Sequence, residues 1–325
     1  MKRKNRVMKA CVVGSLVIDI TIYPSKNFFL IKDLLAFPFD YKTQIEKISL
    51  DVGGSGFNVA KVLSILGNKV EFFGKVGNDS YGEMILKEMK KSKISTKNVK
   101  KENSMTGFSL IFLYGEEKTI LTYRGANNLL SEKDLDVSVL KKCDWFIFTS
   151  MTSNENIKFL RKAIEVSKTH GIKIICNPSV AMVDYQRENL LEFMKKSEFV
   201  IMNKKEAMKL TQTKNPLEAC KKLKKISKAT VIVTMGKKGA VVFNDKLKIF
   251  EAYKVKVIDT TGAGDSFTAA FSHSFSKTKD IDYSIKFSNA YAALKISKGK
   301  GYFPNEKEVL EFMSEKNVRI KREKA

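Results

Sequence analysis

Short apolar runs alternate with amphipathic segments along most of the chain. Runs rich in Val, Ile and aromatic residues predict buried strands, and apolar residues at helical spacing between them predict covering helices. The alternation is most regular between residues 145 and 234. Strands are predicted there at residues 145–148, 173–176, 199–202 and 230–234, and helices at residues 156–168, 187–196, 204–210 and 216–226. This pattern indicates an α/β fold, in which helices cover a parallel sheet.

The N-terminal third departs from this regular pattern. The run at residues 10–18 predicts a buried first strand with Asp19 at its carboxyl end. Residues 20–50 fit neither a long helix nor a simple crossover, whereas residues 106–114 and 118–123 alternate as the two strands of a hairpin do. We expect these segments to pair as a small lid of strands beside the main sheet.

The first of two glycine clusters precedes a predicted helix. Gly53 and Gly54 let the backbone approach a ligand closely, and Asn58 in the first helical turn carries an amide that can bind hydroxyl groups. A tight turn with an N-capping side chain explains the same residues. The local pattern leaves both interpretations open.

The second cluster, at residues 262–264, lies between a predicted strand at residues 253–258 and a predicted helix at residues 266–275. Such a turn leaves N–H groups pointing outward at a helix N-terminus, where anions bind. Asp265 is then either a helix N-cap or a general base beside a site where negative charge develops.

The composition is typical of a globular protein with a large core. The chain has 325 residues, of which 43% are apolar and 29% charged. It shows no internal repeat, low-complexity block or linker. We therefore expect a single domain over residues 1–325, with lid segments near residues 20–50 and 105–124.

The net charge of +24 is high enough to suggest an acidic partner. The lysines are spread along the whole chain, however, and form no basic stripe with interleaved aromatic residues, which argues against nucleic-acid binding. No run approaches the roughly 18 apolar residues of a membrane span, and the run at residues 10–18 is interrupted by Gly14 and Ser15. We expect a cytoplasmic protein that binds neither nucleic acid nor membranes. The four cysteines match no metal-ligand spacing.

The two glycine clusters together suggest phosphoryl transfer. If both follow strands of one parallel sheet, they face the same crevice at its carboxyl edge. The turn at residues 262–264 would hold a transferring phosphoryl group and Asp19, Gly54 and Asn58 a polyhydroxylated acceptor, with Asp265 between them. The sequence contains neither a GxxxxGK[ST] loop nor the HRD and DFG motifs of protein kinases.

Five short motifs follow one another along the chain. They are Gly53-Gly54-Ser55-Gly56-Phe57-Asn58, Gly125-Ala126-Asn127, Asn203-Lys204-Lys205-Glu206, Thr234-Met235-Gly236-Lys237-Lys238-Gly239 and Asp259-Thr260-Thr261-Gly262-Ala263-Gly264-Asp265. In this order they make the chain resemble the ribokinase-like (PfkB) family of carbohydrate and nucleoside kinases, over roughly residues 8–315. The resemblance implies a three-layer ribokinase-like fold with a mainly parallel central sheet, flanking helices and a small β-lid.

The resemblance also implies an ATP-dependent kinase that transfers the γ-phosphate to a hydroxymethyl group of an unphosphorylated sugar. The catalytic positions are Asp265 as general base and Gly262, Ala263 and Gly264 as anion hole. The sugar-binding positions are Asp19, Gly53, Gly54, Asn58 and Asp259. The nucleotide-binding positions are Asn203, Thr234, Gly236, Gly239 and Asn289, and Glu206 is associated with Mg²⁺, directly or through water. In relatives the lid often also serves in dimerisation, which implies a homodimer.

Departures from the family pattern bear on the acceptor. Ser55 and Phe57 stand where ribokinases usually carry Lys and Ala, and a serine at the first position argues against a phosphorylated sugar. Phe57 narrows the pocket, stacks on a base or packs the helix. Arg124 either meets an acidic acceptor group or faces solvent from the lid. Relatives use a potassium-like ion near the second glycine cluster, but residues 298–301 do not align cleanly with the loop involved, so activation by K⁺ stays open.

Two alternatives to a sugar kinase remain at this stage. A nucleoside kinase of the adenosine or pseudouridine type shares every catalytic element of the family. A catalytically silent sugar or nucleotide sensor on the same fold is the more distant alternative, and the intact Asp265 argues against it.

Overall fold

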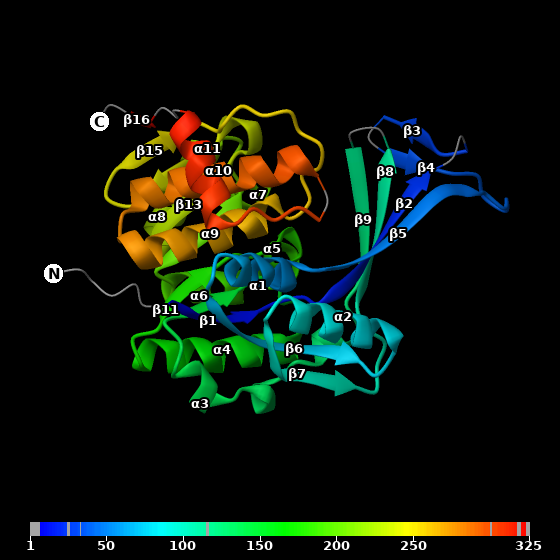
Figure 1. Ribbon diagram of the computed structural model, residues 1–325, viewed down its shortest axis with the longest axis horizontal. Helices are drawn as coiled ribbons and strands as arrows, with labels where there is room; N and C mark the ends of the chain where they lie inside the picture. Colours follow the sequence, from blue (N-terminus) through cyan, green and yellow to red (C-terminus); the bar gives the residue numbers. More distant parts are fainter. Residues whose placement is uncertain are drawn as a thin grey trace.

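A ten-stranded sheet forms the centre of the molecule (Figure 1). The computed structural model describes residues 7–24, 27–32, 34–114, 117–299, 301–316 and 320–322. The strands of this sheet are β1 Lys9–Val13, β6 Lys69–Gly77, β7 Ser95–Glu102, β10 Trp145–Phe148, β11 Lys173–Cys176, β12 Phe199–Asn203, β13 Thr230–Thr234, β14 Ala240–Phe243, β15 Leu247–Phe250 and β16 Ile320–Arg322. Their order is β16-β15-β14-β13-β12-β11-β10-β1-β6-β7, parallel from β13 to β7 and antiparallel from β13 to β16.

Helices cover both faces of the sheet and complete three layers. They are α1 Ser55–Ile65, α2 Ser80–Lys91, α3 Val137–Leu140, α4 Asn154–Thr169, α5 Val180–Tyr185, α6 Arg187–Lys195, α7 Lys204–Thr211, α8 Pro216–Ser227, α9 Ala263–Thr278, α10 Ile281–Lys298 and α11 Glu306–Glu315, with short 3₁₀ turns at Gly125–Leu129, Glu132–Asp134 and Gly236–Lys238. Among the described residues, no helix is both long and apolar enough to cross a membrane.

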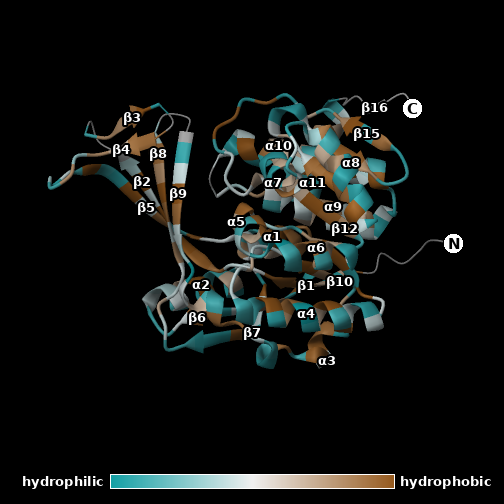
Figure 2. Ribbon diagram, turned by 180° about the vertical axis from the view of Figure 1, so that it is seen from behind, coloured by the Kyte–Doolittle hydropathy of each residue, from teal (hydrophilic) through white to brown (hydrophobic). Residues whose placement is uncertain are grey.

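The alternation of side chains along each strand divides the core in two. On β1, Ala10 and Val12 point into one buried cluster, which also contains α1, α2, α9 and α10, and Cys11 and Val13 point into the other, with α4, α6 and α8. Figure 2 shows largely hydrophobic central strands between helices that are banded with hydrophobic and hydrophilic residues. The predicted α/β fold, with a mainly parallel sheet between helices, is therefore confirmed.

A separate small sheet stands to one side of this body, at the right in Figure 1. Its strands are β2 Val17–Pro24, β5 Ile45–Gly53, β8 Phe108–Tyr114 and β9 Glu117–Tyr123, in the order β5-β2-β8-β9, and a short hairpin of β3 Phe29–Ile31 and β4 Leu34–Ala36 lies beside it. β2 and β8 pair in parallel, so the N-terminal excursion joins the β8–β9 hairpin as expected. The predicted lid of strands is confirmed. The assignment of the chain to one domain stays a prediction.

The predicted single strand at residues 10–18 is wrong. The run contains two strands, β1 in the main sheet and β2 in the lid, which separate at Gly14. A Cβ at Gly56 would lie 2.8 Å from Gly14 Cα, so the chain leaves the main sheet where it passes closely under α1. Asp19 therefore lies on β2, opposite Asp51 of β5, and not at the end of a main-sheet strand.

Two further differences concern strands. Residues 253–258, predicted as a strand, form no sheet pairing, although Tyr253 is buried. The Ile258 N–H donates instead to the Ile296 carbonyl at 2.8 Å. The outer side of β15, the strand that precedes this segment, is paired with β16. β7 was not predicted because its lysine-rich sequence lacks apolar alternation, a composition that suits an edge strand.

The close approach of α1 to the end of β1 depends on Gly54. Gly54 caps α1 with φ 101°, and a Cβ there would lie 2.3 Å from the Ser15 carbonyl oxygen. Gly67, which follows α1, has φ 82° but open space around it. A side chain at position 54 would therefore be unfavourable both because of backbone strain and because of the close contact with Ser15. A side chain at position 67 would be unfavourable because of backbone strain alone.

We expect Gly54→Ala to lower the free energy of unfolding by about 3 kcal/mol or more, and Gly67→Ala by about 1 kcal/mol. Urea unfolding curves of the two variants measure the difference. Equal losses would show that the close contact between α1 and Ser15 contributes nothing.

Candidate functional site

The residues that end or follow the parallel strands meet at the carboxyl edge of the main sheet. Ser150 follows β10, Asn177 follows β11, and Asn203 and Thr234 end β12 and β13. All four line a cavity of about 240 Å³, and the N-terminal turn of α9 contributes Gly264 to it. Ligands of open α/β sheets bind outside this edge. The cavity is therefore the candidate site.

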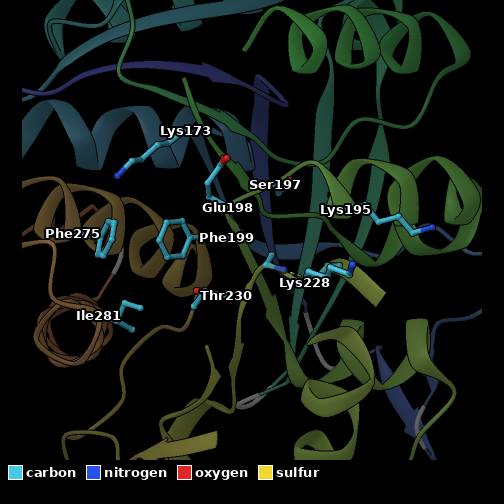
Figure 3. Close-up of a pocket in the computed structure, with 11 residues that line it drawn as sticks. Lys173, Lys195, Ser197, Glu198, Phe199, Lys228, Thr230, Phe275 and Ile281 are labelled. Atoms are coloured by element: carbon cyan, nitrogen blue, oxygen red, sulfur yellow. Dashed lines mark hydrogen bonds between the residues drawn. The ribbon is translucent and has the colours of Figure 1, made fainter. Parts of the chain in front are cut away.

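A larger hollow of about 460 Å³ lies at the opposite, amino edge of the sheet (Figure 3). Lys173 and Thr230, the first residues of β11 and β13, line it. Its carboxylate, Glu198, already accepts a hydrogen bond from the Ile174 N–H at 2.6 Å. In Figure 3 the side chains of Lys173 and Lys195 point in opposite directions. None of the five sequence motifs reaches this hollow, so we assign it no role.

A side-chain hydrogen bond joins the first turns of α1 and α9. Asn58 Nδ2 donates to Asp265 Oδ2 at 2.9 Å. Gly262 caps α9 with φ 69°, and a Cβ there would lie 3.2 Å from Asn58 Nδ2. Glycine at this position therefore lets the two helix ends touch. The two glycine clusters, far apart in the sequence, meet as expected.

The first turn of α9 offers two N–H groups to an anion. The N–H of Ala263 donates to the Thr260 carbonyl at 3.2 Å and is already used. The N–H groups of Gly264 and Asp265 come next, and among the described residues neither has a backbone acceptor. Gly264 is exposed within the cavity. Of the three residues predicted to form the anion hole, Ala263 therefore has its N–H occupied, and Asp265 adds an N–H that was not among them. The anion hole itself stays a prediction.

Burial raises the pKa of Asp265 to about 6. The hydrogen bond from Asn58 and the positive charge of Lys295 oppose this rise, whereas the negative charge of Asp19 adds to it. A carboxyl group with a pKa near 6 is ionised at pH 7 but more basic than an ordinary carboxylate. These properties suit a general base.

Asn203 and Glu206 form a reciprocal cap at the start of α7. Asn203 Oδ1 accepts from the Glu206 N–H at 3.0 Å, and Glu206 Oε2 accepts from the Asn203 N–H at 2.9 Å. Burial raises the pKa of Glu206 to about 7, and the charge of Asp265 adds to the rise. Glu206 and Asp265 thus line the same cavity and repel each other when both are ionised.

The two other predicted acidic residues lie at the lid side of the site. Asp259 Oδ1 accepts from the N–H of Thr261 at 2.8 Å and from its hydroxyl at 2.7 Å. Lys118 of β9 donates to the same hydroxyl at 2.9 Å, so the lid touches the turn that begins at Asp259. The carboxylate of Asp19 lies over Gly53, where a Cβ would be 2.0 Å from Asp19 Oδ2.

The residues expected to bind nucleotide do not all reach the cavity. Thr234 lines it, whereas Gly236, Gly239 and Asn289 do not. Gly236 and Gly239, with φ 60° and 90°, form the turn between β13 and β14. Asn289 on α10 donates to the Glu251 carbonyl at 3.3 Å.

The structure separates the interpretations of Phe57 and of Arg124. Phe57 is 1% exposed and belongs to the buried core, so it packs the helix and neither narrows the pocket nor stacks on a base. The Arg124 guanidinium donates to the hydroxyl of Ser150 at 2.6 Å and to its carbonyl at 3.2 Å. Since Ser150 lines the cavity, the solvent-facing interpretation of Arg124 is wrong.

Two parts of the site were not predicted. One is a cluster of hydroxyl groups, in which Ser55 Oγ donates to Thr149 Oγ1 at 2.8 Å and lies 3.2 Å from Ser15 Oγ. Its members come from three distant segments, so the sequence alone does not reveal it. The other is Lys295, which follows the buried Tyr291 by one helical turn. A lysine on an otherwise apolar helix face is a pattern that can be read in the sequence.

Nearly the whole chain matches one family of known enzymes. The model of the pfkB family of carbohydrate kinases matches residues 8–308. The chain belongs to the pfkB family of carbohydrate kinases. The sequence-based assignment to this family is therefore confirmed.

Individual pfkB-family relatives cover nearly the full length. The chain is 28% identical to a deoxyribokinase of Salmonella typhi, covering 94% of this chain and 99% of that protein. It is 30% identical to a ribokinase of Lactococcus lactis, covering 85% and 90%.

Two solved structures illustrate the likeness in fold. A putative ribokinase II from E. coli in complex with ATP and Mg²⁺ has a TM-score of 0.80 at 21% identity, covering 95% of this chain and 100% of the other. Adenosine kinase from Sinorhizobium meliloti has a TM-score of 0.77 at 22% identity, covering 92% and 96%. The ribokinase-like fold is confirmed by these likenesses.

The raised pKa of Asp265 makes its charge a cost to folding. Its value of about 6 in the folded protein lies above the ordinary 3.8. The ionised carboxylate therefore destabilises the fold fully above pH 6, and the effect disappears below about pH 4.

We expect Asp265→Asn to raise the free energy of unfolding by about 1–3 kcal/mol at pH 8, because Asn keeps an oxygen for the Asn58 amide and carries no charge. Denaturant unfolding at several pH values from 8 to 4 should show the gain shrinking with acidity. Asp245→Asn, in the exposed β14–β15 turn, is the control. A gain that does not change with pH would contradict the assigned cause.

Proposed function

We propose that the chain transfers the γ-phosphate of ATP to the hydroxymethyl group of an unphosphorylated sugar. The observation that carries the proposal is the 2.9 Å contact between Asn58 and Asp265. It holds a carboxyl group with a pKa of about 6 at a helix terminus with open N–H groups. Membership of the carbohydrate kinase family, and the ribokinase and deoxyribokinase among the relatives, support the proposal.

Asp265 is the general base in this proposal. As the oxygen of the acceptor hydroxyl attacks the γ-phosphorus of ATP, its proton passes to the Asp265 carboxylate. The bond between the γ-phosphorus and the β–γ bridging oxygen breaks, and ADP leaves. The N–H groups of Gly264 and Asp265 donate to the oxygens on which negative charge develops, and the dipole of α9 adds to their effect. Gly262 lets the turn approach Asn58, and Ala263 fixes it through its bond to Thr260.

The acceptor binds on the lid side of Asp265. Asn58 and Asp259 offer side-chain oxygens or an amide to sugar hydroxyls, and Asp19 on β2 offers a carboxylate from the lid. Gly53 and Gly54 let the carboxylate of Asp19 and the backbone of Ser15 come close, since a side chain at either glycine would meet them.

The chain's residues fit ATP and Mg²⁺. Asn203 and Thr234 line the cavity and would contact the nucleotide. The turn with Gly236 and Gly239, which follows Thr234, and Asn289 on α10 are the other nucleotide-binding residues of the proposal. No cluster of three or more metal-binding side chains occurs among the described residues, which suits Mg²⁺, since this ion usually takes one or two carboxylates besides water and phosphate. Glu206 is the carboxylate that would hold it through a water molecule. The ion neutralises negative charge on the phosphates.

The hydroxyl cluster favours an acceptor without phosphate. Ser55 and its partners Ser15 and Thr149 are uncharged, and their hydroxyl groups are bonded to one another at the carboxyl edge of the sheet. A second phosphate would meet no lysine at this position. The nucleoside kinase alternative keeps the same machinery, and the fold it shares with an adenosine kinase supports that alternative. A silent sensor would not require a carboxyl group poised as Asp265 is.

The lid surface supports association into a homodimer. Side chains of the lid that are large, apolar and at least 58% exposed are Ile31, Leu34, Phe37, Phe39, Tyr41 and Leu121. Monomeric proteins rarely expose so many apolar side chains together. We therefore retain the homodimer through the lid as part of the proposal.

A coupled ADP-release assay across pentoses, hexoses, ketodeoxy sugar acids and nucleosides tests the function. We expect an unphosphorylated sugar to give the highest kcat/KM, and Asp265→Asn to reduce turnover by about a thousandfold or more without weakening ATP binding. Asp245→Asn should behave as the wild type. Absence of stimulation by every acceptor would reject the kinase, activity of Asp265→Asn within a few-fold would reject the base, and a preference for nucleosides would select the alternative.

Sedimentation equilibrium tests the lid dimer. We expect Phe39→Ser, which removes a fully exposed aromatic ring (100%), to shift the dimer to monomer at micromolar concentration by removing buried apolar area. Tyr185→Ser, which changes a 76% exposed ring on α5, is the matched control outside the lid. A wild-type monomer, or equal effects of both variants, would contradict the lid interface.

A further inference from the structure

Lys295 is a charged residue on the buried face of α10. The residue is 5% exposed, and Tyr291, one turn earlier, is fully buried. Burial of an ammonium group costs free energy unless its surroundings compensate the charge. A methionine would fill the same space without this cost. What surrounds the ammonium therefore decides what the charge does.

Local contacts compensate the ammonium only in part. Lys295 Nζ donates to the Tyr302 carbonyl at 3.4 Å and lies 3.8 Å from the centroid of the Phe303 ring. The first is a long hydrogen bond, and the second is a cation–π contact. An ammonium group can donate three hydrogen bonds. Among the described residues, the Tyr302 carbonyl is the acceptor found for Lys295, so most of its hydrogen-bonding capacity is unused.

The side chain of Lys295 lies against the turn that carries the site. A Cβ added at Gly262 would lie 3.5 Å from Lys295 Cε. The carbonyl of the next residue, Ile296, accepts from the N–H groups of Ile258 and Asp259 at 2.8 and 3.3 Å. The last turn of α10 thus binds the start of this turn through the backbone and reaches its glycine through Lys295.

The charges that face Lys295 are mostly those of the site. Burial lowers the pKa of Lys295, Asp259 and Asp265 raise it, and Lys61 lowers it. In the opposite direction, the charge of Lys295 lowers the pKa of Asp265, while burial and Asp19 raise it. Two site carboxylates therefore favour the ammonium, and the ammonium favours the ionised form of Asp265.

We propose that Lys295 is a positioning residue whose ammonium provides a built-in positive charge behind the turn at residues 258–262, in the place of a free monovalent cation. It favours the ionised form of Asp265, lies near the carboxylate of Asp259, and adds a positive charge beside the N-terminal turn of α9. A K⁺ ion carries the same charge and has about the size of an ammonium group, so the two would exclude each other from this place. The catalytic part of this inference rests on the proposed kinase function, whereas the position and charge of Lys295 do not.

Thermal unfolding tests the built-in charge without any substrate. Each protein is heated in KCl and in tetramethylammonium chloride at equal ionic strength. We expect wild-type Tm values that agree within about one degree, and a Tm of Lys295→Ala that is several degrees higher in KCl, since K⁺ fills the gap between the carboxylates. Lys295→Met, which fills the gap with an uncharged chain, should not respond to K⁺.

Lys61→Met is the matched control for these variants. Lys61 also lies over the Phe303 ring, at 4.8 Å, but is paired with Glu88 at 2.8 Å. It loses the same charge and the same type of aromatic contact, yet it should leave the response to K⁺ unchanged. A wild-type protein that is itself stabilised by K⁺ by several degrees would overturn the proposal, even if the Lys295 variants do not fold.

The pH profile of kcat/KM tests the effect on catalysis. Without the positive charge the protonated form of Asp265 is favoured, so Lys295→Met should move the acidic limb to higher pH by about one unit or more and lower kcat at least about tenfold. A merely structural lysine would not move this limb. An unchanged limb in a folded Lys295→Met, or activation of the wild type by K⁺ of tenfold or more, would contradict the proposal. If no acceptor is found, the kinase proposal fails and the thermal experiment still decides the role of Lys295.

Discussion

The hydrogen bond from Asn58 to Asp265, 2.9 Å long, is the contact on which the organisation of the site depends. It joins the first turns of α1 and α9, which are far apart in the sequence. It forms because glycines at the two turns let these helix ends approach each other without intervening side chains. Gly54 brings α1 against the end of β1, and Gly262 brings α9 against Asn58. The parallel sheet places both helix ends at one edge, and the glycines allow them to come into contact there.

The site that results stores electrostatic strain. Two carboxyl groups, Asp265 and Glu206, have raised pKa values of about 6 and 7 because burial opposes their charges. The charge of Asp19 adds to the rise for Asp265, and the charge of Asp265 adds to the rise for Glu206. A fold optimised only for stability would place neutral groups here. Lys295 offsets part of the strain on Asp265, and on Glu206 its own cap with Asn203 does so. Protonation relieves the remainder at low pH. At neutral pH, binding of a metal ion with the nucleotide would relieve it by bringing positive charge into the cavity.

The sequence predicts features that follow from hydrophobic periodicity and from glycine-containing turns. It does not predict which strands pair in the folded protein. The regular βα units after Trp145 and the lid of strands were predicted. The meeting of the two glycine clusters beside Asp265 was predicted as well. The prediction of one strand at residues 10–18 was wrong because the apolar pattern continues through Gly14, where the chain passes from the main sheet to the lid. Residues 253–258 alternate as a strand does, but the outer side of the preceding strand, β15, is already paired with β16, and Ile258 bonds to α10 instead. Whether an alternating run joins a sheet depends on which edge is open, and no local pattern records that.

The same limit applies to acceptor choice, and there the structure adds what the sequence lacked. From the sequence, Ser55 shows only that the lysine usual in ribokinases is missing. In the structure Ser55 is bonded to Thr149 and lies beside Ser15, so the space is occupied by hydroxyl groups that satisfy one another. A phosphate placed there would have to break these bonds without gaining a cation, whereas a sugar hydroxyl can exchange one neutral hydrogen bond for another at little cost. Discrimination against phosphorylated acceptors would therefore come from the closed hydroxyl cluster as much as from the missing charge.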